Sequence, residues 1–351
     1  MKISFIGYYG SNFGDLLMLT SLIDYYGQHY NQINIYTYGN EDNLCDSLLL
    51  NAHRNKIQIF GLTGDKKVSY SNFFKTVKGS KYIIWGGGTC FMDQGGTGGL
   101  KYMIEAYFAK VSILYLGVGI DSDHKAKTKL IVFTAVLLSK ALYFRDEKSL
   151  LRANNLTFNL FKHKIKHVPD IAHINTIQNK SDSSDYIVFC CRDLSSYEYV
   201  NNEKVNNYLT GLAIAVCKHL SIKRIVNLIC DLEVDDKQSR IANELFVQNG
   251  IVVNNVFGYK VEDSLIAIKN SKFVISSRLH PAVIAQNLSV PYALFNYSDK
   301  NKKFVEDTNE NSRLIGRNNF EEYIPDFQKP KIGNLENKRQ SILNVLAKYS
   351  K

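Results

Sequence analysis

The sequence lacks a hydrophobic run long enough to cross a membrane. Its longest apolar window, LIVFTAVLLSKALYF at residues 130–144, falls short of the roughly 20 residues that a transmembrane helix needs and contains Lys140. It therefore predicts a buried helix. The first residues, MKISFIGYYG, look like an initial strand and lack the apolar region of a cleavable signal. We expect a cytoplasmic protein, with a peripheral position at the inner face of the membrane as an alternative.

Signatures of metal binding and of common nucleophiles are also missing. Six cysteines occur without a CxxC pair, so reduced thiols are expected. His163 and His167 are four residues apart, but no HExxH glutamate accompanies them. The sequence contains no GxSxG, Walker or GxGxxG pattern. We expect neither a metal nor a bound cofactor.

The charge has one prevailing sign. The chain carries a net charge of +10 at pH 7, from 43 basic and 33 acidic residues. This excess favours anionic partners such as nucleic acid, anionic lipid or phosphorylated small molecules. The lysines are spread along the chain, and DKNKKF is the only short basic run. A diffuse basic surface is therefore expected and nucleic-acid binding is not. An enzyme for small anions, in solution or at a membrane surface, fits the charge better.

Short apolar runs alternate with amphipathic segments along most of the chain. This alternation predicts parallel sheets covered by helices on both faces, and 351 residues favour two domains. The polar segment 174–186 is the expected linker. We predict an α/β protein with two Rossmann-like parallel-sheet domains facing a cleft, at residues 1–175 and 186–330, and a C-terminal helix at 331–351. Ligands of such sheets bind at the carboxyl ends of the strands.

The predicted elements cover both halves. Strands are expected in KISFIGYY, INIYTYG, KIQIFG, KYIIWGGG, SILYLGVGI and ALYFRD, and then in YIVFCCRD, RIVNLICD, GIVVNNVFG, KFVISS and PYALFNY. Helices are expected near residues 15–29, 100–110, 125–140, 202–220, 235–249, 261–269 and 281–288, and from about 335.

An arginine and a histidine stand where a strand becomes a helix, in FVISSRLHPAVIAQNL. Pro281 suits the first turn of a helix, and the residue before a proline is biased toward extended backbone, so His280 is expected at the cap. On extended chain, Arg278 and His280 project to one side. With the free N–H groups of the helix they would form an anion site with a general acid attached. The alternative is a capping histidine beside a surface arginine.

Cations follow three separate strands of the second half. Arg192 ends FCCRD, Arg278 follows FVISS, and Lys300 ends ALFNYSDK. Because the carboxyl ends of parallel strands share one edge of a sheet, we expect these three cations to converge.

Glycine-rich turns and carboxylates mark the first half. Gly87 and Gly88 belong to WGGGTCFMDQGGTGG, a segment that fits either an anion cradle or a flexible lid and that contains Asp93. Asp15 follows GYYGSNFG and either caps a helix or faces the cleft. Asp170, in HVPDIAH, is expected in a cleft-facing loop.

Taken in order, these pieces resemble the polysaccharide pyruvyl transferase family. The resemblance rests on GYYGSNFGD, WGGGTCFMD, LYFRDEKSLLRA followed by VPD, CRD, and SSRLHPAVIAQNLSVPYALFNYSDK, over about residues 1–305. It implies a fold similar to GT-B glycosyltransferases. It also implies that Arg192, Arg278, Leu279 and His280 serve donor binding and catalysis.

The resemblance further implies phosphoenolpyruvate as donor and a pyruvate ketal on a sugar of a surface glycan as product. The acceptor would be a glycan or lipid-linked saccharide, and membrane association and homo-oligomers are open. An acid–base group such as His280 is worth about 10²–10⁴-fold in rate. Two alternatives remain: a GT-B glycosyltransferase using a nucleotide sugar, and a non-catalytic glycan-binding protein that keeps the fold.

Overall fold

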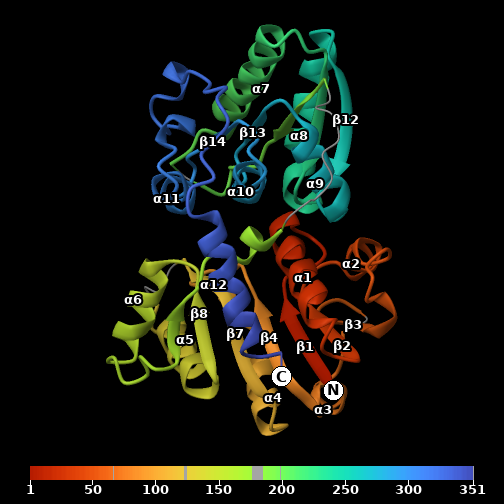
Figure 1. The fold of residues 1–351 in the computed structure, drawn as a ribbon, viewed down its shortest axis with the longest axis vertical. Helices are drawn as coiled ribbons and strands as arrows, with labels where there is room; N and C mark the ends of the chain where they lie inside the picture. Colours follow the sequence, from red (N-terminus) through yellow and green to blue (C-terminus); the bar gives the residue numbers. More distant parts are fainter. Residues whose placement is uncertain (66, 122–124, 176–184, 198, 351) are drawn as a thin grey trace. The chain divides into compact units, whose positions relative to one another are not determined.

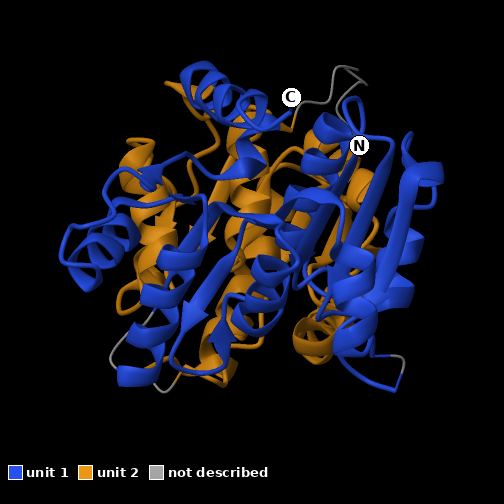
Figure 2. Cartoon of the chain, turned by 90° about the horizontal axis from the view of Figure 1, so that it is seen from below, with its two compact units in different colours: residues 1–174, 336–351 blue, residues 175–335 orange. Residues whose placement is uncertain are grey.

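The computed structural model describes residues 1–65, 67–121, 125–175, 185–197 and 199–350. Within them the chain divides into two compact units. Residues 1–174 and 336–351 form the first, and residues 175–335 form the second (Figure 2). Residues 176–184, most of the expected linker, lie outside the described residues.

The first unit is built on a nine-stranded sheet with the order β3-β2-β1-β4-β7-β5-β6, in which β8 pairs with β7 and β9 (Figure 1). All pairs are parallel except β5 with β6. The strands are β1 (Lys2–Gly7), β2 (Gln32–Thr37), β3 (Ile57–Gly61), β4 (Ser80–Gly86), β5 (Thr89–Met92), β6 (Gly96–Thr97), β7 (Ser112–Ile120), β8 (Ala141–Phe144) and β9 (Ile165–His167).

Helices connect and cover these strands. They are α1 (Phe13–Tyr26), α2 (Glu41–Ser47), α3 (Tyr70–Val77), α4 (Leu100–Phe108), α5 (Ala126–Leu138), α6 (Glu147–Leu156) and α12 (Leu335–Ala347), with short 3₁₀ turns η1 (Arg54–Lys56) and η2 (Ile171–Ile174). The central strands are buried almost throughout, as strands covered on both faces must be. One hydrophobic core combines side chains of α3, α4, α5 and α6 with those of the sheet.

The second unit is a six-stranded, fully parallel sheet with the order β12-β11-β10-β13-β14-β15. Its strands are β10 (Ile187–Cys190), β11 (Arg224–Ile229), β12 (Val252–Phe257), β13 (Val274–Ser276), β14 (Tyr292–Phe295) and β15 (Leu314–Ile315). Its helices are α7 (Asn202–His219), α8 (Leu232–Gln248), α9 (Val261–Asn270), α10 (Leu279–Asn287) and α11 (Asp299–Asp307), with 3₁₀ turns η3 (Asn311–Arg313) and η4 (Phe320–Glu322).

The C-terminal helix packs on the first unit. Tyr30 donates to the Tyr349 carbonyl at 2.9 Å, and the Tyr349 and Tyr143 hydroxyls are 3.1 Å apart. Tyr349 is almost fully buried. The chain therefore returns to its first unit after completing the second, and residues 336–351 belong to the first unit.

No helix in the described ranges is both long and apolar enough to cross a membrane. The expected buried helix at 130–144 is instead the end of α5, a turn and strand β8, because Ser139 closes the helix and Lys140 is exposed. The six cysteines are free, and the buried thiols of Cys190 and Cys230 in the second unit lie 3.3 Å apart.

Candidate functional site

Four neighbouring strands of the second sheet end in charged or phenolic side chains. In spatial order β11, β10, β13 and β14, they are followed by Asp231 and Asp235, by Arg192, by Arg278, and by Tyr297 and Lys300. The carboxyl ends of parallel strands meet at one edge, which is where ligands of such sheets bind. The structure thus brings the three expected cations to one edge of one sheet.

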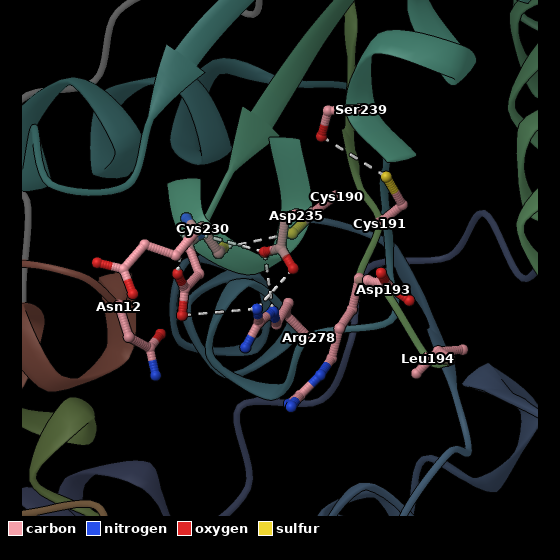
Figure 3. A network of polar contacts seen from close by, with 12 residues as sticks. Asn12, Cys190, Cys191, Asp193, Leu194, Cys230, Asp235, Ser239 and Arg278 are labelled. Atoms are coloured by element: carbon pink, nitrogen blue, oxygen red, sulfur yellow. Dashed lines mark hydrogen bonds and ion pairs between the residues drawn. The ribbon is translucent and has the colours of Figure 1, made fainter. Parts of the chain in front are cut away.

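Arg278 is buried and forms an ion pair with a carboxylate that the sequence prediction missed (Figure 3). Its Nε donates to Asp235 Oδ2 at 3.0 Å, and its Nη2 donates to Oδ1 at 2.6 Å. Asp231 lies 3.9 Å from Nη2. Burial opposes the charge of Arg278, but pairing with Asp235 outweighs it and raises the pKa of the guanidinium. Arg278 is therefore a fixed cation with a built-in counter-ion.

The backbone around Arg278 is equally fixed. Ser276 Oγ accepts from the Arg278 N–H at 2.9 Å and donates to the Arg278 carbonyl at 2.7 Å. Arg278 is itself the N-cap of α10, with extended backbone at φ −89° and ψ 141°. Asp235 lies in the first turn of α8, whose N-cap is Asp231. The helix expected near 235–249 thus begins earlier, which places both acidic side chains at the strand ends.

The prediction that His280 caps the helix is wrong. Helix α10 begins at Leu279, so His280 is its second residue and Pro281 its third. The N–H groups of a first turn have no intrahelical acceptor, so proline costs no hydrogen bond at its third position. His280 therefore lies in a helix and not on extended chain, so the alternation of side chains along a strand does not apply to it. The prediction that Arg278 and His280 project to one side loses its basis. His280 and Leu279 are both half-buried in the first turn.

Arg192 lies beside a pair of contacting aromatic rings, those of Tyr197 and Tyr297, whose centroids are 5.1 Å apart. Its guanidinium carbon lies 5.3 Å from the ring centroid of Tyr197 and 5.1 Å from that of Tyr297. Its Nη1 donates to the Tyr297 hydroxyl at 3.0 Å. Tyr199 donates to the Tyr297 carbonyl at 3.0 Å and so fixes the same segment. Among the described residues, the buried Nε of Arg192 has no hydrogen-bond partner, which leaves a donor for a ligand.

Tyr297 is the second group that the sequence prediction missed. It is fully buried, and burial alone would oppose its ionisation. The positive charges of Lys300, Arg192 and Arg278 nevertheless lower its pKa to about 8. The Lys300 ammonium lies 5.4 Å from the ring centroid. A phenol that ionises this easily in a buried position reports a strongly positive local potential, and that potential would favour a bound anion equally.

In the first unit, Asp15 lies against a glycine turn. The prediction that Asp15 caps its helix is wrong, because α1 begins at Phe13 and its N-cap is Asn12, which accepts from the Gly14 N–H at 3.1 Å. Asp15 Oδ2 accepts from Asn12 Nδ2 at 3.2 Å. A Cβ on Gly88 would come within 2.6 Å of Asp15 Oδ1, so only glycine allows this approach.

The glycine segment after β4 is paired backbone for most of its length. Gly87 and Gly88 have φ values of 79° and 77°, which favour glycine, and a Cβ on Gly87 would collide with Met18. Residues Thr89–Met92 then pair with β6 and β7. Asp93 Oδ1 accepts from the Lys125 N–H at 3.2 Å. The glycines therefore serve tight turns and close packing here.

Asp170 is engaged by an arginine. Its Oδ2 accepts from Arg145 Nη1 at 3.1 Å, and its Oδ1 accepts from the Ala172 N–H at 3.0 Å. Arg145 Nη2 also donates to Thr89 at 2.9 Å. Arg145 thus joins the three segments that follow strands β4, β8 and β9. Within the part of the chain that the structure describes, no group of His, Cys, Asp or Glu is arranged to hold a metal ion.

The buried ion pair makes a direct prediction. Asp235→Asn keeps the shape of the side chain but leaves the Arg278 charge buried without its partner, so the free energy of unfolding should fall by about 3–5 kcal/mol. Denaturant unfolding measures this. Asp236→Asn is the matched control, because Asp236 pairs with Arg240 at the surface and should cost less than about 1 kcal/mol. An equal loss of unfolding free energy in the two variants would show that the Arg278–Asp235 pair stabilises the fold no more than a surface pair does.

Tyr297 should titrate early. The tyrosinate absorbance of the folded wild type, minus that of Tyr297→Phe, should rise with a midpoint near pH 8. Because folding lowers this pKa from 10.0, the unfolded chain binds more protons between about pH 8 and pH 10. The contribution of Tyr297 to the free energy of unfolding should therefore increase with pH across that window. A difference spectrum that titrates only near pH 10 would refute the assignment.

Solved structures similar to this chain share its two-unit fold at low identity. The UDP-GlcNAc 2-epimerase of Methanocaldococcus jannaschii is 15% identical, with a TM-score of 0.62 over 99% of this chain and all of the other. The Neisseria meningitidis UDP-GlcNAc 2-epimerase bound to UDP-GlcNAc is 12% identical, with a TM-score of 0.61 over 99% of this chain and 100% of the other. Anabaena HepE, solved with UDP and glucose, is 14% identical, with a TM-score of 0.55 over 100% of this chain and 95% of the other.

These likenesses establish a GT-B-like fold with two Rossmann-like parallel-sheet units, as predicted. A comparison with curated protein sequences gives no match. The family model of polysaccharide pyruvyl transferases, however, matches residues 12–299, a range that includes Asp15, Arg192, Arg278 and His280. The resemblance found in the sequence is therefore confirmed, and the chain belongs to the polysaccharide pyruvyl transferase family.

Proposed function

We propose that this transferase moves the enolpyruvyl group of phosphoenolpyruvate onto a sugar of a surface polysaccharide or its precursor as a pyruvate ketal and releases phosphate. The observation that carries the proposal is the meeting of Arg192, Arg278 and Lys300 at one edge of the second sheet, where the buried Nε of Arg192 has no partner among the described residues. The donor carries a carboxylate and a phosphate, and arginines suit both groups. Family membership supplies the reaction class.

In this proposal Arg192 is the principal donor ligand. Its guanidinium is pre-oriented by Tyr197 and Tyr297, and its buried Nε is a donor without a partner among the described residues. Arg278, Leu279 and Lys300 complete the donor site. Asp235 engages Nε and Nη2 of Arg278. In this proposal Arg278 therefore contributes its fixed positive charge and its third guanidinium nitrogen, Nη1, to the donor site.

The proposed chemistry needs one proton transfer to carbon. A general acid protonates the methylene carbon of the enol, and a sugar hydroxyl attacks the adjacent carbon and loses its proton. The bond from that carbon to the phosphate oxygen breaks and phosphate leaves, and a second hydroxyl closes the ketal. Of the two hydroxyl protons, one restores the general acid and the other leaves with the phosphate. His280 is the proposed acid, since imidazole exchanges protons near neutral pH. No metal or further cofactor is included in the proposal.

The donor site can be tested without an acceptor. A bound dianion would offset the cations around Tyr297 and so make its ionisation less favourable. The tyrosinate titration of Tyr297 should therefore shift to higher pH when phosphoenolpyruvate is added. Arg192→Lys should weaken this donor binding by about 1.5–3 kcal/mol, because the two-pronged geometry is lost. An unchanged midpoint at saturating donor would place the donor elsewhere.

The reaction class is decided by the product that appears. The wild type, incubated with phosphoenolpyruvate and candidate glycans or lipid-linked saccharides, should release inorganic phosphate and form a ketal, with or without a chelator. Release of UDP from UDP-sugars instead would favour a GT-B glycosyltransferase. His280→Gln should lower kcat by about 10² or more while the fold and donor binding persist. Full turnover by a folded His280→Gln variant would remove His280 from the mechanism.

We further propose that the first unit binds the sugar acceptor. Asp15, Asp93 and the turn at Gly87 and Gly88 lie at strand ends of that unit, and sugar hydroxyls bind well to carboxylates. Asp170 is a weaker candidate, because Arg145 and a backbone N–H already occupy both of its oxygens. The protein would act in the cytoplasm, where phosphoenolpyruvate is available.

Asp15→Asn tests the acceptor side. The KM for the acceptor should rise at least about tenfold, the value of one charge-assisted hydrogen bond, while donor binding is unchanged. The helix cap is unaffected because Asn12 provides it, so stability should change by less than about 0.5 kcal/mol. Steady-state kinetics and thermal unfolding give both quantities. Normal acceptor kinetics in this variant would mean that Asp15 has only a structural role.

A further inference from the structure

Most of the net charge of the chain comes from one segment of the first unit. Residues 125–167 contain ten lysines and arginines and two acidic residues, a net charge of +8 in a chain with +10. One of the two acids, Asp146, serves as the N-cap of α6. The expectation of a diffuse basic surface is therefore wrong. The lysines do not form a run in the sequence, because apolar residues separate them, but α5, α6 and the turns beside them gather them.

The basic side chains of this segment are accompanied by exposed apolar ones. Six of its lysines are exposed: Lys125, Lys127, Lys129, Lys140, Lys148 and Lys162. Large apolar side chains stand among them in the same segment, with exposed fractions of 65% for Leu130, 79% for Phe158 and 69% for Leu160, and with Leu137 and Leu151 also exposed. Lys140 is set apart, because its ammonium lies 5.3 Å from the ring centroid of Tyr82, and we call the other ten side chains the basic–apolar face.

The segments of this face adjoin one another. Helix α5 packs against α6, as Figure 1 shows for the first unit. The turn after α6 returns to α5: the rings of Phe133 and Phe161 are 6.4 Å apart, and Lys164 Nζ donates to the Leu137 carbonyl at 2.9 Å. Leu130 and Leu137 are seven residues apart and so lie on one side of α5.

The backbone presents Phe158 to solvent at a cost. Phe158 and Asn159 have φ values of 50° and 59°, in the left-handed region. A bulky aromatic residue there is an outlier, and such a conformation costs on the order of 1 kcal/mol or more. Burial of Phe158 in the protein does not offset this cost, because most of the side chain is exposed. The conformation ends α6, because the Asn159 N–H donates to the Asn154 carbonyl at 2.8 Å and the Phe158 N–H donates to the Asn155 carbonyl at 3.1 Å, and it leaves Phe158 in water.

We propose that the basic–apolar face docks on an anionic lipid bilayer, with Phe158 and Leu160 inserted among the acyl chains and the lysines at the headgroups. Charge complementarity selects this partner, since lysines flanking apolar side chains match a surface that is negative outside and apolar within. Nucleic acid would use the lysines but would leave five large apolar side chains without a role. This inference does not depend on the proposed pyruvyl transfer.

Vesicle sedimentation tests the proposal. The full-length protein should bind vesicles of phosphatidylcholine containing about a third phosphatidylglycerol, bind pure phosphatidylcholine at least about tenfold more weakly, and lose affinity as salt rises. The triple variant Lys127→Glu, Lys129→Glu, Lys162→Glu should lose at least about tenfold in affinity. Phe158→Ser combined with Leu160→Ser should lose a similar factor, because apolar insertion is removed.

Matched controls lie in the second unit. The variant Lys218→Glu, Lys223→Glu, Arg224→Glu reverses three exposed charges, and Ile324→Ser removes an exposed apolar side chain. Both should bind vesicles like the wild type, and circular dichroism should show every variant folded. The proposal is overturned if the face variants bind as well as these controls. It is equally overturned if the wild type ignores anionic vesicles, whether or not it then binds RNA.

Discussion

The buried ion pair between Arg278 and Asp235 is the constraint on which the second unit's strand-end site depends. It joins the helix that follows β13 to the helix that follows β11, across the intervening strand β10. Breaking a buried pair leaves one charge without compensation, so separating the N-termini of α8 and α10 would cost about 3–5 kcal/mol. Because Arg278 is also the N-cap of α10, the pair fixes where that helix begins. It therefore fixes the position of His280, two residues later.

The pair also explains why the rest of the site stays positive. Asp235 offsets Arg278, whereas Arg192 and Lys300 both adjoin the phenol of Tyr297. The phenol responds with a lowered pKa. Arg192 contacts two rings and is hydrogen-bonded to one of them, so little side-chain freedom remains to be lost when an anion binds. The site is thus organised before any ligand arrives.

The sequence predicts the long strands and the cations at their ends, because apolar runs followed by a charged residue are visible in one dimension. It does not predict where the helices begin: α1, α8 and α10 start at residues 13, 232 and 279, and not at 15, 235 and 281. These first turns hold Asp15, Asp235 and His280. Asp235 and Tyr297 were missed since their importance comes from tertiary partners 43 and 105 residues away. Strands β5, β6, β9 and β15 were missed because none of them lies in an apolar run like those that reveal the equally short β8, β10, β13 and β14.

The positive charge of the chain occurs in two physically different forms. At the strand ends of the second unit, Arg278 is buried and Arg192 nearly so, and each is oriented by specific partners, which suits recognition of one small anion. Along residues 125–167 of the first unit, the charge is carried mainly by exposed lysines on flexible stems beside exposed leucines and Phe158. Such lysines attract any dense anionic surface but select no particular molecule. A total net charge cannot distinguish these two forms, because the difference between them is burial and partner geometry.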